Sequence, residues 1–330
     1  MNRRDEVLEA IRAANGDAVS GEDLAHRLGI SRVAVGKHVS GLRAAGYRVD
    51  AITGRGYVLA GVPDAPLPAE VRRYLRSRTW ERLEGGGETG STNADAAALA
   101  RAGAPHGTAV LASRQTAGRG RLGRSWESPE GGVYVSALLR PSLPPAALTG
   151  MPLAVATGVG AELARFGVDA GVKWPNDLLL GARKLAGVLL EISAEADRTA
   201  WLVVGVGLNV QRPTRPVEGA AYLEDVATGI GKAEAAAAVL DGIAEGYRML
   251  TGDGFGAVRA AFEKRDALAG GLVCVSDVDG SLVAEGRAAG VDDEGRLRVR
   301  GAGGVVAVVS GDVTLAGERG AGERGAGGGP

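Results

Sequence analysis

The chain has 330 residues with 38 Lys and Arg against 39 Asp and Glu, so its net charge is −1 and a nucleic-acid surface would have to be a local basic patch. Its one cysteine, Cys274, excludes an internal disulfide scaffold, and its 45% hydrophobic content and length are typical of two or three globular domains. No apolar run approaches the roughly 18 residues of a membrane span, and the first residues lack the apolar stretch of a signal peptide, so we expect a cytoplasmic protein with no membrane partner.

The N-terminal residues predict three helices followed by a hairpin. Apolar residues recur with helical spacing from Val7 to Ile11, and Ser20 and Ser31 stand at N-cap positions of a second and a third helix. Two short apolar segments enclose a Gly-rich turn over residues 47–59, as in a β-hairpin. This order is the layout of a winged helix-turn-helix, which we assign to residues 1–62.

The second and third helices of this domain carry a concentrated positive charge. No acidic residue occurs from Leu24 to Val49. A solvated basic face would explain this pattern, but the charge coincides with the helix that such a fold presents to a DNA major groove. The predicted DNA-binding residues are Arg32, Lys37, His38, Arg43 and, in the hairpin turn, Arg55.

Three prolines within residues 61–68 predict a domain boundary. The segment that follows mixes both kinds of periodicity, which predicts an α+β domain over residues 63–268. We expect helices over 93–102, 146–165 and 232–250, and strands over 109–112, 133–139, 188–192 and 201–206.

The last part of the chain has a different pattern. Four short apolar segments alternate with Asp-Gly and Gly-rich turn signals, which predicts a small SH3-like β-barrel over residues 269–316. Residues 317–330 contain no apolar residue larger than alanine and predict a disordered tail.

The strongest chemical signal is a loop of alternating glycines and arginines from Gly118 to Arg124. Its glycines match a dinucleotide-binding pattern, but no helix can begin directly after them because Pro129 follows closely. Glycines let a backbone fold over a ligand, and guanidinium groups bind phosphate and carboxylate oxygens. The loop is therefore expected to close over a bound anion, whereas a flexible basic surface loop is the plainer alternative.

Three further motifs carry polar residues beside this loop. Gly90-Ser91-Thr92-Asn93 precedes a helix, where a hydroxyl can cap the helix or hold a ligand. Lys173-Trp174-Pro175-Asn176-Asp177 places a cation, an amide and a carboxylate on a stiff segment, which can be a binding element or simply a turn with a surface ion pair. The glycines of Gly205-Val206-Gly207-Leu208-Asn209 allow a ligand or another backbone to approach a strand closely.

Taken in order with Gln115 and Lys184-Leu185-Ala186-Gly187, these motifs resemble the biotin protein ligases, and the preceding winged helix resembles the bifunctional type that also represses biotin-operon transcription. The resemblance covers residues 1–316. It implies a central domain with the biotin ligase fold, which is similar to class II synthetases.

The resemblance also implies roles for individual residues. Lys173, Arg119 and Arg121 would be catalytic, with Lys173 against the biotin carboxylate and the α-phosphate. ATP or the adenylate would contact Trp126, Arg124, Asn176 and Asn209. The biotin pocket would be formed by Ser91, Thr92, Asn93, Gln115, Arg119, Gly120, Arg121 and Lys173. No permanent protein-bound metal is implied.

The implied reaction has two steps. Biotin and ATP, with Mg²⁺, would give biotinyl-5′-AMP, and a lysine of a biotin carboxyl carrier protein would then accept the biotinyl group. Cations that neutralise two repelling anions suit the first step. The resemblance further implies that biotinyl-5′-AMP acts as corepressor by promoting a homodimer that binds operator DNA.

Three alternatives stay open at this point. A lipoate or octanoyl ligase of related fold would use a similar domain. A DNA-binding regulator could retain the central domain only as a sensor. A third possibility is a ligase whose winged helix no longer binds DNA.

Overall fold

The computed structural model describes residues 2–195 and 197–315 of the chain. These residues form two compact units that divide between Ala65 and Pro66. The predicted boundary at residue 62 lies a few residues earlier. The predicted tail over 317–330 lies outside the described residues.

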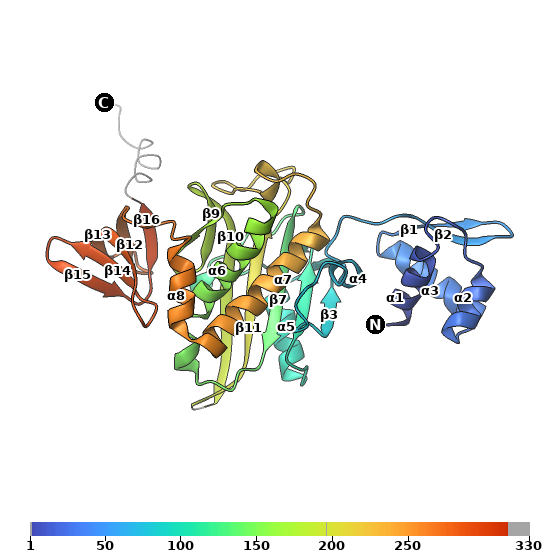
Figure 1. Ribbon diagram of the computed structural model, residues 1–330, viewed down its shortest axis with the longest axis horizontal. Coiled ribbons are helices and arrows are strands. Elements are labelled where there is room, and N and C mark those ends of the chain that lie inside the picture. Colours follow the sequence, from blue (N-terminus) through green and yellow to red (C-terminus); the bar gives the residue numbers. More distant parts are fainter. Residues whose placement is uncertain (1, 196, 316–330) are drawn as a thin grey trace, which may run out of the picture. The chain divides into compact units, whose positions relative to one another are not determined.

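The first unit contains three helices and a hairpin, as the sequence predicts. The helices are α1 (Arg3–Arg12), α2 (Gly21–Leu28) and α3 (Arg32–Ala44), and the hairpin pairs β1 (Arg48–Ile52) with β2 (Gly56–Gly61) (Figure 1). Their apolar faces share one core, formed by Val7, Leu8, Ile11, Leu24, Val35, Val39, Leu42, Tyr47 and Val49, each at most 4% exposed.

Local signals fix the helix ends of this unit. Ser20 Oγ accepts from the backbone of Glu22 and Asp23, and Ser31 Oγ accepts from Ala34 N at 3.1 Å. Gly29 ends α2 in the left-handed conformation, with φ of 61°. The two expected N-caps are therefore confirmed.

The second unit is built on a seven-stranded mixed sheet with strand order β3-β5-β7-β11-β10-β9-β8. Only β3 and β5 run parallel within it, and the other neighbours are antiparallel. The strands are β3 (Arg82–Gly85), β5 (Thr108–Ala112), β7 (Gly132–Leu139), β8 (Gly171–Lys173), β9 (Asp177–Leu180), β10 (Arg183–Glu195) and β11 (Arg198–Asn209), while β4 (Glu88–Thr89) and β6 (Arg114–Gln115) form a separate short pair.

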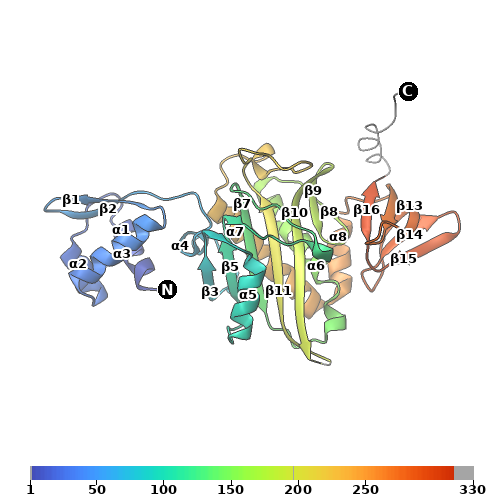
Figure 2. The same cartoon turned by 180° about the vertical axis from the view of Figure 1, so that it is seen from behind.

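The two faces of this sheet are covered differently (Figures 1 and 2). Helices α6 (Met151–Leu163), α7 (Lys232–Arg248) and α8 (Phe255–Glu263) lie over one face and bury the larger core. Among the helices that the structure describes, one, α5 (Thr92–Arg101), packs on the other face, through its alanines and Val110, Leu138 and Val203. The strands beyond α5 are thus left free to form a binding surface.

Alternation along each strand determines which residues reach that surface. In β11, Val203 belongs to the α5-side core, whereas Leu202 and Val204 belong to the larger one. Because strand side chains alternate, Gly205 and Gly207 lie on the α5 side, as does Gly187, which pairs with Gly207.

A five-stranded antiparallel sheet completes the described chain. Its strands are β12 (Leu272–Ser276), β13 (Leu282–Val291), β14 (Leu297–Gly301), β15 (Gly304–Val308) and β16 (Asp312–Leu315), in the order β15-β14-β13-β12-β16. Its apolar side chains continue the core of the larger sheet. The four expected strands are present, and the sequence analysis missed β16.

Two differences from the expected elements have physical causes. The helix expected over 146–165 is interrupted, since a 3-10 turn (Pro145–Leu148) precedes α6 and another (Ala164–Phe166) follows it. An 18-residue window within Pro145–Phe166 has the mean hydropathy of a membrane span, contrary to our reading of the sequence, but 67% of that window is buried. This segment is therefore part of the core of the second unit, and α6 packs along α7.

The short strands β8 and β9 were missed in the sequence analysis because they hold only three and four residues.

Candidate functional site

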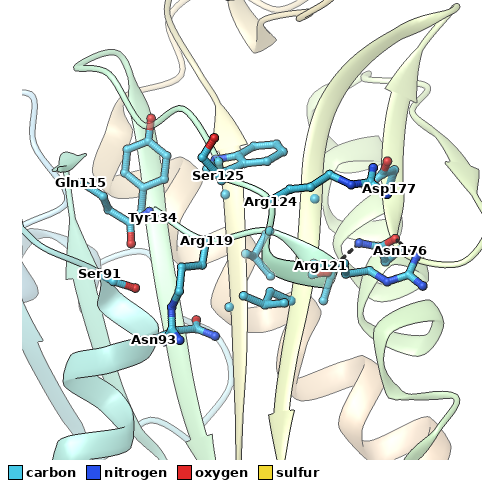
Figure 3. A pocket seen from close by; sticks show the side chains of 18 of the residues that line it. Ser91, Asn93, Gln115, Arg119, Arg121, Arg124, Ser125, Tyr134, Asn176 and Asp177 are labelled. Carbon is cyan, nitrogen blue, oxygen red and sulfur yellow. Dashed lines mark hydrogen bonds between the residues drawn. The ribbon is translucent and has the colours of Figure 1, made fainter. Parts of the chain in front are cut away.

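The predicted binding motifs meet in a cavity on the α5 side of the sheet, open to solvent on one side. A concave site lined by a few convergent polar groups is typical of small-molecule binding. The start of α5 forms one wall, the loop after β6 lies across the mouth, and β10 and β11 form the floor (Figure 3). Nearly all sequence-predicted pocket residues line it, namely Ser91, Thr92, Asn93, Gln115, Arg119, Gly120, Arg121, Arg124, Trp126 and Asn176.

The floor of the cavity depends on glycine. A side-chain Cβ on Gly205 would lie 2.0 Å from Asn93 Oδ1, and one on Gly207 would lie 2.5 Å from Trp126 Nε1. Real Cβ atoms do not approach heavy atoms so closely, so both positions require glycine for the observed placement of these side chains. The close approach that the sequence predicts at these strand glycines is therefore present, with side chains as the approaching groups.

A hydrogen-bonded polar wall lies beside α5. Gln115 Oε1 accepts from the backbone N of Thr92 at 2.8 Å, and the Thr92 hydroxyl lies 2.7 Å from Ser136 Oγ. Ser136 Oγ in turn lies 2.6 Å from Asn93 Oδ1. The Thr92 hydroxyl also donates to Gln115 Oε1 at 3.0 Å, and Ser136 can give its one proton to either Thr92 Oγ1 or Asn93 Oδ1. These contacts link four polar side chains into one wall.

Ser91 does not act as a helix cap. It occupies the N-cap position of α5 with no side-chain capping hydrogen bond, and it is 6% exposed. The alternative of a simple capping hydroxyl is therefore wrong for Ser91. Its hydroxyl lines the cavity instead.

Glu191 connects this wall to the loop across the mouth. Its Oε2 accepts from Asn93 Nδ2 at 2.8 Å, and its Oε1 forms an ion pair with Arg119 Nη1 at 3.1 Å. Figure 3 shows Arg119 extended toward Asn93. The sequence analysis missed Glu191 and Ser136. Ser136 is a single buried hydroxyl within the apolar strand β7, a pattern that identifies buried polar sites, whereas Glu191 is half-buried in a strand with several other polar residues.

The other two loop arginines contact the opposite wall. Arg121 Nη1 donates to Asn176 Oδ1 at 3.1 Å, and Arg124 forms an ion pair with Asp312 at the start of β16. Burial lowers the pKa of Arg121, and the nearby carboxylates of Asp177 and Asp312 oppose that shift. Both groups stay cationic, because an arginine is charged throughout the physiological range.

Lys184 is the lysine that the structure brings into the cavity. Its Nζ lies 2.8 Å from Asp177 Oδ1, a charge contact outside hydrogen-bonding geometry, and 4.9 Å from the centre of the Trp126 ring. The cation–π contact and the carboxylate together hold the ammonium against the cavity. Trp126 Nε1 is buried with no hydrogen-bond partner among the described residues.

The prediction that Lys173 lies in the site must be corrected. Lys173 ends β8, near the edge of the sheet, and does not line the cavity. Its carbonyl accepts from Asn176 N at 3.2 Å, so this residue shapes the turn that presents Asn176 and Asp177. The sequence analysis assigned the role to the lysine of the first motif, whereas the geometry favours Lys184 in the motif that follows.

The two asparagines predicted to contact ATP, Asn176 and Asn209, line different cavities. Asn176 Nδ2 donates to the Val188 carbonyl at 2.7 Å, which leaves its Oδ1 for Arg121. Asn209 Nδ2 donates to the Lys184 carbonyl at 3.2 Å. Asn209 does not line the main cavity but an adjoining one, which also includes Trp126 and Lys184. Trp126 and Lys184 therefore line both cavities.

The predicted DNA-binding residues differ in solvent exposure and in the hydrogen bonds that they already make. Arg32 and Lys37 are exposed on α3, and Arg55 is exposed in the hairpin turn. His38 is half-buried, and Arg43 Nε donates to the Val49 carbonyl at 2.8 Å, which ties it to the hairpin. Arg32, Lys37 and Arg55 are thus the strongest candidates.

Family models match three parts of the chain. The biotin/lipoate A/B protein ligase family matches residues 89–209, an HTH domain matches residues 3–58, and the biotin protein ligase C-terminal domain matches residues 278–315. The first match spans the motifs that line the cavity.

Several known proteins are similar to the chain. The bifunctional ligase/repressor BirA of Bacillus subtilis is 33% identical, over 94% of this chain and 98% of its own. The biotin–[acetyl-CoA-carboxylase] ligase of Mycobacterium tuberculosis is 34% identical over 71% of this chain and 89% of its own. The structure of a biotin protein ligase from Aquifex aeolicus with biotin and ATP has a TM-score of 0.62 and 30% identity, and the match covers 72% of this chain and 99% of that one.

Proposed function

The chain belongs to the family of bifunctional biotin protein ligase/repressors, and on this premise we propose that it activates biotin with ATP, transfers it to a carrier-protein lysine and represses transcription by binding DNA. The observation that carries the ligase proposal is the cavity in which four cations, Arg119, Arg121, Arg124 and Lys184, surround a polar, glycine-floored pocket.

In the first step, the carboxylate oxygen of biotin attacks the α-phosphorus of ATP and pyrophosphate leaves. Two anions must approach each other, and negative charge builds on the α-phosphate oxygens. Positioned cations reduce the repulsion between the two anions and stabilise the charge on the α-phosphate. We assign this work to Arg119, Arg121 and Lys184, in place of the Lys173 of the sequence-based prediction. Ser91, Thr92, Asn93, Gln115 and Gly120 are proposed to hold the polar part of biotin.

The adjoining cavity suits the nucleotide. Trp126 lines both cavities and offers an aromatic face, and its indole N–H is available to an acceptor. We therefore propose that the adenine lies beside Trp126, with Asn209 holding the backbone of Lys184 in place. Arg124 and Asn176 would contact the adenylate.

In the second step, the ε-amine of the acceptor lysine attacks the acyl carbon of biotinyl-5′-AMP. An amide forms, AMP leaves, and the amine loses a proton. The acyl-adenylate is labile in water, so the Gly118–Arg124 loop is proposed to cover it until the biotin carboxyl carrier protein arrives.

Magnesium is proposed to enter with ATP as part of the substrate. Mg²⁺ is usually held by substrate phosphates with one or two carboxylates, and it would neutralise charge on the pyrophosphate. Asp177 and Asp312 are the carboxylates that line the cavity. Within residues 2–195 and 197–315, no group of three His, Cys, Asp or Glu residues is placed to hold a metal.

For the regulatory activity, we propose that biotinyl-5′-AMP is the corepressor, that it promotes a homodimer, and that this dimer binds operator DNA through α3 and the hairpin. The exposed Arg32, Lys37 and Arg55 support the DNA contact. A cytoplasmic location, where ATP, carrier protein and DNA are all present, belongs to the same proposal.

ATP–pyrophosphate exchange tests the ligase proposal directly. Exchange that depends on biotin is expected, whereas exchange with lipoate alone would assign the chain to lipoate-type ligases. If neither acid supports exchange, the central unit acts at most as a sensor and the proposed ligase activity is wrong.

A further inference from the structure

The face that α3 presents to solvent has an unusual composition. Val33, Lys37 and Ser40 are exposed at positions i, i+4 and i+7, so they share one side of the helix. Val33 is 83% exposed, the largest exposure among the exposed bulky apolar side chains of the described chain. A branched apolar side chain thus stands in the middle of the basic face.

Val33 does not contribute to the core of its own unit. The other branched apolar side chains of α3, Val35, Val39 and Leu42, are at most 1% exposed. They complete the contact with α1 and α2 without it. A β-branched residue also lowers helix propensity slightly, so neither packing nor helix stability favours valine here.

The position of Val33 within the helix suits contact with base edges. It is the second residue of α3, directly after the Ser31 N-cap and Arg32. In helix-turn-helix proteins the first residues of the recognition helix enter the major groove, while cations around them contact phosphates. Two residues that follow Val33 are slim, Ala34 directly after it and Gly36 one turn further, so the groove wall can approach.

The charge around Val33 makes DNA the best-matched partner. Arg32 and Lys37 flank it, and no carboxylate occurs in the sequence from Leu24 to Val49. An apolar side chain can read only one feature of a major groove, the C5-methyl group of thymine. A protein partner would require a broader apolar patch than this single side chain.

We propose that Val33 is a specificity-determining residue that reads a thymine methyl group in the operator. This inference rests on the proposed DNA binding and specifies one base-pair preference within it. Lys37 and Arg32 would supply phosphate contacts with no sequence preference.

The test starts from a random-sequence duplex pool, because the operator sequence is unknown. The full chain, supplied with biotin, ATP and Mg²⁺, selects its preferred duplex. That duplex is then synthesised with uracil in place of each thymine in turn, which removes one methyl group and leaves the pairing intact. Affinities are measured for the natural chain, for Val33→Ala and for Val62→Ala, a control that trims another exposed valine, 46% exposed and outside α3.

We expect one uracil substitution to weaken binding of the natural chain about fourfold, because this is the loss of affinity expected when one buried methyl group is removed. The same substitution should weaken binding of Val33→Ala less than binding of the natural chain, because the shorter alanine makes less contact with a thymine methyl group, and Val62→Ala should behave like the natural chain. If every uracil duplex binds as well as its thymine parent, or if Val33→Ala keeps the sensitivity, the inference is wrong although DNA binding stands. If no duplex is selected and no salt-dependent binding occurs, the DNA-binding proposal fails and this inference with it.

Val33→Thr provides a second variant that keeps the branched shape and one methyl group. It should retain sensitivity to the same uracil, since a threonine methyl can also contact thymine. Equal loss in the threonine and alanine variants would contradict a methyl contact and point to a fold defect. A melting curve for each variant separates these outcomes.

Discussion

The ammonium of Lys184 lies 2.8 Å from Oδ1 of Asp177, across the antiparallel pair of β10 and β9. This pair brings together a cation from one predicted motif and a carboxylate from another. The Lys184 ammonium also lies over the Trp126 ring, so one side chain touches both proposed subsites.

Lys184→Ala should lower the rate of biotin adenylation by about 10²- to 10³-fold, the usual loss when one positioned cation or donor is removed from a developing charge. Lys173→Ala is the matched control and should change the rate little, because Lys173 lies in the same unit but outside the cavity. Biotin-dependent pyrophosphate exchange measures both. The reverse ranking would restore the sequence-based assignment of Lys173.

Arg121→Ala should speed the release of biotinyl-5′-AMP. A charged hydrogen bond is worth about 1.5–3 kcal/mol, so dissociation should be about 10- to 100-fold faster. Arg114→Ala serves as control, because Arg114 pairs with Glu88 and does not line the cavity. Stopped-flow release of the adenylate is the measurement, and an unchanged rate would mean that the loop is not a lid.

Gly207→Ala should disturb the nucleotide subsite selectively. The new methyl group would meet the Trp126 indole and displace it. KM for ATP should rise more than the Kd for biotin, because the displaced ring borders the adjoining cavity. Gly256→Ala, where nothing lies within 4 Å of the new Cβ, is the neutral control. An unchanged KM for ATP would argue against adenine beside Trp126.

Replacing Arg32 and Lys37 together by alanine should weaken DNA binding and reduce its salt slope by about two, close to one for each lost phosphate contact. Ligase activity should not change, because both residues lie in the first unit. A chain with Arg101→Ala and Lys264→Ala, two exposed cations of the second unit, has the same net charge and should bind DNA normally. Equal losses in both chains would indicate a general charge effect.

The stability of the second unit should decrease below about pH 6.5 in part through His106. Its Nδ1 accepts from the backbone N of Arg140 at 3.1 Å, which requires the neutral ring. Burial lowers the pKa of His106 below its ordinary value of 6.5, so the unfolded chain binds the proton first as the pH falls. The contribution of the neutral His106 to the free energy of unfolding is therefore complete above pH 6.5, and it decreases as the pH falls toward the folded-state pKa. His106→Asn should flatten the dependence of Tm on pH in this range, and an identical profile would exclude His106 as a source.

The sequence was most informative where a pattern is local. The caps Ser20 and Ser31 and the apolar strands expected over 133–139 and 201–206 depend on neighbouring residues, and the structure has them as expected. The division of the second unit into a ligase domain and an SH3-like domain stays a prediction, as do the roles of the individual site residues.

What the sequence did not predict depends on contacts between distant segments. Asp312 reaches the cavity from the last strand, and Glu191 joins Asn93 to Arg119 across almost a hundred residues of chain. Neither pairing has a local signal. Which of Lys173 and Lys184 faces the cavity has no local signal either, because only the register of β8, β9 and β10 decides it.

The glycine floor also limits how the pocket can be redesigned. Gly187, Gly205 and Gly207 have no side chain left to remove, so substitution on this side can only narrow the space. Room for a bulkier biotin analogue has to come from trimming Asn93, which faces Gly205. An engineered enzyme for enlarged labels should therefore keep all three glycines and vary the wall above them.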